Sequence, residues 1–193
     1  MVEVPQPEPE ILDPRIRRTR QMLHEALEQL LASRSIDKIS VGDIAEQATL
    51  NRATFYDHYP DKFALLEGLV ASRFQELLTR RGVVFDGTCS SALSHITRAT
   101  CDYLASLPSG AQCPQREMER HFETATMAVV RNAILQGARK HPTPGIPPEM
   151  LAATISGAIY AGAREWVHTP SRAPVESAVK SIISLIRPMF PTA

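Results

Sequence analysis

The chain has 193 residues, and its 21 Lys and Arg balance 21 Asp and Glu, so the formal net charge is zero. Hydrophobic residues make up 44% and charged residues 22%, a globular composition that excludes a long disordered chain, a collagen and a disulfide scaffold. Because the chain as a whole is no polycation, any binding of nucleic acid must come from the local placement of charge.

The cysteines and histidines form no recognisable metal motif. Three cysteines occur without a C-x-x-C pair and six histidines without an H-E-x-x-H pattern, so we expect no metal site and no cofactor. No apolar run is long enough to span a membrane, and the acidic, proline-rich residues 1–13 lack the features of a signal peptide. We therefore expect a cytoplasmic protein with a disordered N-terminal tail.

Four helices are predicted in the first part of the chain. Apolar residues recur with a helical period over about 14–33 and predict the first helix. Ser40 and Asp43 fit an S-x-x-D capping pattern at the start of a second, short helix. Asn51 is suited to cap a third short helix, and Asp61 a fourth, longer one.

The rest of the chain is also predicted to be helical. Arg-Gly and Asp-Gly pairs between residues 81 and 88 indicate a boundary. Helices are expected over about 90–107, 114–140 (whole or broken in two), 148–168 and 174–190. The predicted fold is all-α, with an N-terminal three-helix head and a linking helix at 14–81 and an all-helical regulatory and dimerisation domain at 82–193.

The second and third helices, joined by a short turn, have the spacing of a helix-turn-helix whose second helix enters the DNA major groove. Phe55 and Tyr59 are four residues apart and share a core-facing side. Arg52 and Ala53 in the first turn are the candidates for base contacts, because an arginine can bond guanine through two donors and an alanine methyl can meet that of thymine.

Other polar residues of this segment are candidates for contact with the DNA backbone, which positions a protein without reading sequence. The predicted backbone contacts are Thr54, Tyr56 and His58 on the third helix, Lys62 at the start of the fourth, and Ser40 at the start of the second. In the alternative interpretation, a plain helical bundle, Tyr56 and Tyr59 are packing residues and Lys62 is solvated. The joint spacing of the residues favours the helix-turn-helix.

Two charged features leave alternatives open. Asp57 points toward the groove, where it can accept a hydrogen bond from cytosine but also repels phosphate. Four arginines lie before or along the first helix, where they either touch the DNA backbone or minor groove or form a solvated helix start: Arg15, Arg17, Arg18 and Arg20.

Residues 15–70 resemble the DNA-binding domain of the TetR (tetracycline-repressor-like) family of bacterial transcription regulators. The resemblance rests on IAEQA at 44–48, TFYDHY at 54–59 and DKFALL at 61–66. It implies a homodimer that binds a palindromic operator through two three-helix heads. Thr49 departs from the family pattern, since it stands where a glycine is usual in the turn.

By the same resemblance, Tyr56, His58 and Lys62 contact the DNA backbone, and Arg52 and Ala53 contact bases. The family also implies an effector pocket in the second half of the chain, for a small, partly apolar molecule. Side chains of mixed polarity are the candidates for its lining, although packing explains each one singly: His95, Cys101, Tyr103, Met118, His121, Phe122, Met127 and Arg131.

Small and apolar side chains on the last two helices are candidates for a four-helix dimer interface, or for an intramolecular core: Ala153, Gly157, Ala161, Val179 and Ile183. The sequence carries no catalytic motif, so we do not expect an enzyme. The predicted function is a transcriptional repressor that a small effector releases from its operator. An activator, a corepressor-dependent regulator and a dimeric ligand-binding or redox-sensing protein remain alternatives.

Overall fold

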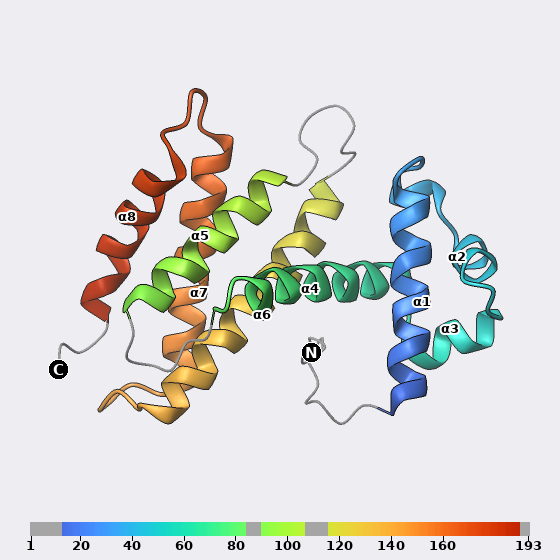
Figure 1. Ribbon diagram of the computed structural model, residues 1–193, viewed down its shortest axis with the longest axis horizontal. Helices are drawn as coiled ribbons and strands as arrows, with labels where there is room; N and C mark the ends of the chain where they lie inside the picture. The colour runs from blue at the N-terminus through green and yellow to red at the C-terminus, as the bar shows by residue number, and fades with distance from the viewer. Residues whose placement is uncertain (1–12, 84–89, 107–115, 190–193) are drawn as a thin grey trace. The chain divides into compact units, whose positions relative to one another are not determined.

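A computed structural model describes residues 13–83, 90–106 and 116–189, and over these ranges the chain forms helices and connecting turns with no strand (Figure 1). The prediction of an all-α fold is confirmed. The predicted tail lies outside the described residues except for Asp13. None of the described helices is both long and apolar enough to cross a bilayer.

The chain divides into two compact units, Met1–Ser72 with Ser109–Ala125 and Arg73–Pro108 with Thr126–Ala193. The division falls inside two helices, α4 (Lys62–Arg80) and α6 (Arg116–Lys140), each of which begins in the first unit and ends in the second. α6 is one unbroken helix. The predicted domains, 14–81 and 82–193, place all of α4 in the first domain and all of α6 in the second. These domain bounds stay a prediction.

The first unit is built around α1, which begins where the Asp13 carboxylate accepts a hydrogen bond from the Arg15 amide at 2.9 Å. α1 buries an apolar stripe, and α2 and α3 pack on it. The bounds in this unit are α1 (Pro14–Leu31), the 3-10 helix η1 (Ile36–Lys38), α2 (Val41–Gln47) and α3 (Arg52–His58), followed by the start of α4. These bounds confirm the predicted order of a long first helix, two short helices and a longer fourth one, while η1 was not predicted.

The second unit contains α5 (Ser90–Ser106), α7 (Pro148–His168) and α8 (Val175–Ile186), which pack on one another. At Gly162 the last two helices approach so closely that a Cβ would lie 2.7 Å from Cγ1 of Ile182. α8 ends earlier than predicted and continues as the 3-10 helix η2 (Arg187–Met189), because Pro188 lacks the amide hydrogen that an α-helix requires.

Candidate nucleic-acid interface

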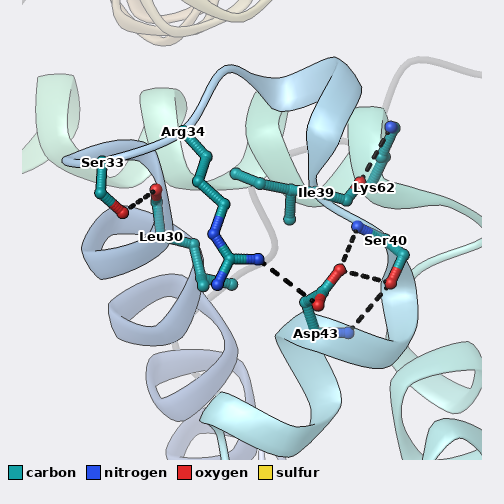
Figure 2. Close-up of polar contacts among 7 residues, drawn as sticks. All are labelled: Leu30, Ser33, Arg34, Ile39, Ser40, Asp43 and Lys62. Atoms are coloured by element: carbon teal, nitrogen blue, oxygen red, sulfur yellow. Dashed lines mark hydrogen bonds and ion pairs between the residues drawn. The ribbon is translucent and has the colours of Figure 1, made fainter.

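The N-terminus of α2 is closed by a capping box (Figure 2). The Ser40 hydroxyl oxygen accepts from the Asp43 amide at 3.1 Å, and the Asp43 carboxylate accepts from the Ser40 amide at 2.8 Å. The Ser40 hydroxyl also donates to this carboxylate, and Arg34 lies 3.5 Å from its other oxygen. The Ser40 hydrogen bonds, with a smaller contribution from Arg34, lower the pKa of Asp43. The cap predicted at Ser40 is thus confirmed, and its hydroxyl is engaged within the protein.

The turn between α2 and α3 ends α2 with a Schellman motif, in which two amides bond back into the last helical turn. The Leu50 amide donates to the Ala45 carbonyl at 2.8 Å, and the Thr49 amide donates to the Glu46 carbonyl at 3.0 Å. Thr49 takes a φ of 57°, the left-handed conformation that glycine adopts without cost. The departure from the family pattern at Thr49 therefore falls on the one residue of the turn whose backbone favours glycine.

The inner face of α3 anchors this helix in the head. Asn51 caps it by accepting from the Thr54 amide at 2.7 Å, as predicted. The Phe55 ring is fully buried, which contributes about 2 kcal/mol on the usual area scale. The hydroxyl of buried Tyr59 lies 2.9 Å from Nε2 of His24, and burial raises the pKa of Tyr59 to about 12.

The outer face of α3 is open to solvent. Arg52, Ala53 and Asp57 are exposed, and Tyr56 exposes 57% of its surface, an unusual degree for a large aromatic residue. Thr54 and His58 are half-buried at the edges of this face, and the Thr54 hydroxyl donates to Asn51 at 3.0 Å. Burial, followed by the charge of Arg20, lowers the pKa of His58, which favours the neutral ring. The DNA-binding roles of these residues stay predictions.

Arg52 lies against the start of α2. A Cβ placed on Gly42 would meet Nη2 of Arg52 and lie 3.1 Å from its Cζ, so the absence of a side chain at Gly42 leaves room for the guanidinium. Glycine is a poor helix former, but at position 42 it leaves the space that the Arg52 side chain occupies. Sequence reasoning overlooked Gly42, although a glycine in the first turn of a capped helix was visible.

Lys62, which is predicted to contact the DNA backbone, has partners within the protein. Its ammonium donates to the carbonyl oxygen of Ile39 at 2.9 Å (Figure 2). It also donates to that of Ile36 at 2.9 Å and lies 3.4 Å from that of Asp37. The ammonium group has three donors, and three backbone acceptors surround it. Contact with phosphate stays a prediction for Lys62, while the structure shows a role inside the protein.

His24 is a second residue that sequence reasoning missed. It lies on α1 beside the buried stripe and meets Tyr59 at the end of α3. The facing position on α4 is Gly68, where a Cβ would come within 3.1 Å of the Tyr59 ring and 3.3 Å of His24. A polar residue next to an apolar stripe was the available signal, but its partner 35 residues away was not visible.

The candidate effector residues fall in both units. Phe122 and His121 belong to the first unit, and His121 bonds Glu67. In the second unit His95 and Arg131 are exposed, Met127 is half-buried, and Tyr103 packs on Phe74 with ring centroids 5.0 Å apart. The side chain of Met118 lies outside the described residues. These assignments stay predictions.

Cys101 is fully buried, and this burial raises the pKa of its thiol to about 11. A protonated, enclosed thiol is a poor nucleophile and a poor redox sensor. His95 lies six residues earlier on α5, on the exposed side of the helix, so the two side chains do not face the same space. Cys89 and Cys113 lie outside the described residues. Among the residues that are described, no three His, Cys, Asp or Glu side chains are grouped to hold a metal ion.

The candidate dimer residues lie on the open sides of α7 and α8. Ala153 and Ala161 are exposed, Gly157 is half-buried with open space around it, and Val179 and Ile183 are half-buried. The opposite face of α7 is buried within the second unit. The small-residue stripe, Ala153, Gly157 and Ala161, therefore lies on the side of α7 that faces away from the core of this unit. The dimer assignment itself stays a prediction.

A three-helix head that presents the outer face of its third helix to solvent defines the helix-turn-helix class of DNA-binding proteins. Residues 23–69 match the family model described as bacterial regulatory proteins, tetR family. This part of the chain is therefore a DNA-binding domain of the TetR type.

Two curated relatives share this part of the sequence. An uncharacterised HTH-type transcriptional regulator of Bacillus subtilis, YxbF, is 35% identical over 68 residues, which are 35% of this chain and 18% of the relative. The nucleoid occlusion factor SlmA of Vibrio cholerae is 28% identical over 72 residues, or 37% of each chain. The similarity therefore spans less than two fifths of either relative.

Two solved structures resemble most of the chain in fold. The FadR repressor of Thermus thermophilus, in complex with lauroyl-CoA, has a TM-score of 0.55 and 16% identity, and the match covers 90% of this chain and 96% of FadR. RolR in complex with resorcinol has a TM-score of 0.50 and 15% identity, with 89% and 88% covered. At such identities the likeness shows a shared fold.

Proposed function

We propose that the protein is a sequence-specific transcriptional repressor that binds a palindromic operator as a homodimer and is released by a small-molecule effector. The observation that carries this proposal is the two-sided character of α3. Its inner face is fixed by buried Phe55 and Tyr59, while Arg52, Ala53 and Tyr56 face solvent. A helix that is rigidly held and openly presented is what major-groove reading requires.

On DNA, Arg52 and Ala53 in the first turn of α3 contact base edges, and Tyr56 and His58 contact the backbone. In the free protein, burial lowers the pKa of His58 and favours its neutral ring, which can still donate a hydrogen bond to a phosphate oxygen. Asp57 is exposed on the same face and accepts a hydrogen bond from cytosine N4, which favours sites that supply this donor.

The open sides of α7 and α8 support a second copy of the chain as partner. Small side chains at 153, 157 and 161 on the open side of α7 let a helix approach closely. Such a small-residue stripe fits an isologous interface, in which the same surface of both copies meets. To read two half-sites one turn of DNA apart, the two copies of α3 in the proposed dimer must lie about 34 Å apart.

An effector role for the second unit draws support from the solved structures of similar fold. FadR of Thermus thermophilus holds lauroyl-CoA and RolR holds resorcinol, so this fold accommodates ligands of very different size and polarity. The proposed effector binds the conformation with low operator affinity more tightly and shifts the population toward it.

Selection of binding sites from a random DNA pool tests the DNA-binding part of the proposal. We expect an enriched palindrome whose half-sites are one helical turn apart. Arg52→Ala is expected to weaken binding by about 1–3 kcal/mol and to relax preference at one base position per half-site. Arg187→Ala, which removes an exposed arginine from the second unit, is the matched control and should change neither property. Recovery of no enriched sequence, or of one that Arg52→Ala leaves unchanged, contradicts the proposal.

A further inference from the structure

The side of α1 that faces the end of α3 is marked by two contacts with Tyr59. Nε2 of His24 lies 2.9 Å from the Tyr59 hydroxyl, and the guanidinium carbon of Arg20 lies 5.8 Å from the centroid of the Tyr59 ring. Burial, followed by the charge of Arg20, lowers the pKa of His58, so Arg20 also lies near the last residue of α3. The first turns of α1 and the last turn of α3 therefore adjoin each other (Figure 1).

The four arginines at the start of α1 point in different directions. At about 100° per residue, Arg17 lies about 20° from His24 around the helix axis, and Arg20 lies about 40° on the other side. Arg18 is about 120° and Arg15 about 180° from His24, so both project away from α3. Arg20 is half-buried, whereas the other three arginines are exposed. Of the four, Arg17 alone is both exposed and on the side of α1 that faces α3.

We propose that Arg17 contacts the DNA phosphate backbone beyond the end of α3 and so extends the DNA-binding surface onto α1. This inference rests on the proposed function, because α3 must lie in the major groove for Arg17 to reach the strand that borders it. Arg17 is about 5 Å from Arg20 along the axis of α1, toward its N-terminus. A cation at this place continues the line that runs from the outer face of α3 past His58 along the same strand.

The dimensions of the duplex favour a phosphate over a base as the partner of Arg17. An α-helix with its side chains is about 10–12 Å across, whereas the minor groove of B-DNA is about 6 Å wide, so α1 stays outside it. The major groove is filled by α3. The phosphates that border the groove are therefore the groups that Arg17 meets, and its planar guanidinium bonds two phosphate oxygens at once. Asp13, one turn before Arg17, already uses one carboxylate oxygen to cap α1.

The salt dependence of DNA binding tests the contact, with Arg18→Ala as the matched control. Both substitutions remove one exposed arginine from the same turn of α1, and alanine is the best helix former, so the helix is retained. We expect Arg17→Ala to bind a selected operator about three- to tenfold more weakly per half-site. It should also reduce the slope of log K against log salt concentration by about 0.9 per half-site. Arg18→Ala should change the affinity by less than about twofold and the slope by less than half as much. Equal effects of the two substitutions, or no effect of Arg17→Ala, overturn the proposal.

Uncharged backbone analogues identify the phosphate that Arg17 contacts. Operators are made with a single methylphosphonate at each position that flanks a half-site in turn. At one position, we expect the replacement to weaken wild type and Arg18→Ala about three- to tenfold, because both still carry the arginine that the phosphate binds. Arg17→Ala should lose less than about twofold there, since its contact is already absent. If Arg17→Ala is weakened as much as wild type at every position, the proposal is wrong.

Site selection with Arg17→Ala separates backbone contact from base reading. A backbone contact carries no sequence information, so the variant should recover the same operator as wild type. A changed base preference beside the half-site would show contact with bases and overturn the assignment to phosphate.

Two outcomes distinguish this proposal from the proposed function. Wild type that selects no sequence contradicts the repressor function, while the salt slopes of Arg17→Ala and Arg18→Ala on an unselected duplex still decide the contact, since every duplex carries phosphates. If wild type selects an operator and Arg17→Ala binds it as Arg18→Ala does, this inference alone is overturned and the repressor function stands.

Discussion

Thr49 provides the sharpest test of the backbone argument, because it is a β-branched residue held at a φ of 57°. The left-handed conformation destabilises the folded state by about 1–2 kcal/mol for a residue with a Cβ, and a glycine avoids this cost. However, a glycine loses more conformational entropy on folding, which offsets about 0.5–1 kcal/mol of the gain. Thr49→Gly should therefore stabilise the turn by about 0.7 kcal/mol, or about threefold in the opening equilibrium.

Hydrogen exchange at the Leu50 amide measures this effect directly, since that amide donates to Ala45 in the same turn. We expect about threefold slower exchange in Thr49→Gly. Thr49→Ala, the matched control, keeps a Cβ and removes only the branched end of the side chain, so it should show little of this gain. Faster exchange in Thr49→Gly than in Thr49→Ala would refute the assignment of strain to this residue.

Three further predictions follow from the contacts of the head and of α5. Gly42→Ala should leave the fold intact, because the atoms in its way are the flexible end of Arg52, and should alter base preference at the position that Arg52 reads, measured by site selection. The pKa of Asp43 is lowered from 3.8 in the folded protein. The stability that its carboxylate gives the cap of α2 is therefore complete above pH 3.8 and is lost as the pH falls through the lower pKa of the folded state. Carboxyl NMR titration checks the direction of the shift, and a raised pKa would contradict it. Cys101 should remain unalkylated in native protein while the unfolded chain reacts, as read from its peptide by mass spectrometry, and equal labelling would show the thiol to be accessible.

The role of Lys62 bears on how its substitution is interpreted. If Lys62 only contacts phosphate, its substitution reduces the salt dependence of DNA binding and leaves the free protein unchanged. If Lys62 instead satisfies three carbonyls within the protein, its substitution alters the free protein as well. Comparison of exchange without DNA and of the salt slope with DNA therefore separates the two roles in one variant.

The caps and short helices of the head could be predicted because their determinants are local. Ser40 with Asp43 and Asn51 with Thr54 are pairs three residues apart, and such hydrogen bonds depend on chain geometry within one turn. The buried side of α3 followed from the four-residue spacing of Phe55 and Tyr59. Thr49 was recognised as unusual in the turn, and the structure supplied the left-handed angle that explains why.

Contacts between distant residues could not be predicted in this way. Lys62 meets a carbonyl 26 residues away, and His121 meets Glu67 across 54 residues. A lysine at the start of a helix is equally compatible with phosphate, solvent or carbonyl partners, and a histidine on an amphipathic helix with a ligand or an ion pair. The choice among these depends on which other helix lies opposite.

The sequence by itself determined the helices, their caps and the side of α3 that is buried, because spacing along a helix decides which side chains share a face. Only the tertiary structure decided which charged groups are still free to meet DNA. A charged side chain takes the partners that packing brings within about 3 Å, and these partners come from segments whose approach no local pattern encodes. That is why Arg52 lies exposed over Gly42, whereas Lys62 is turned inward.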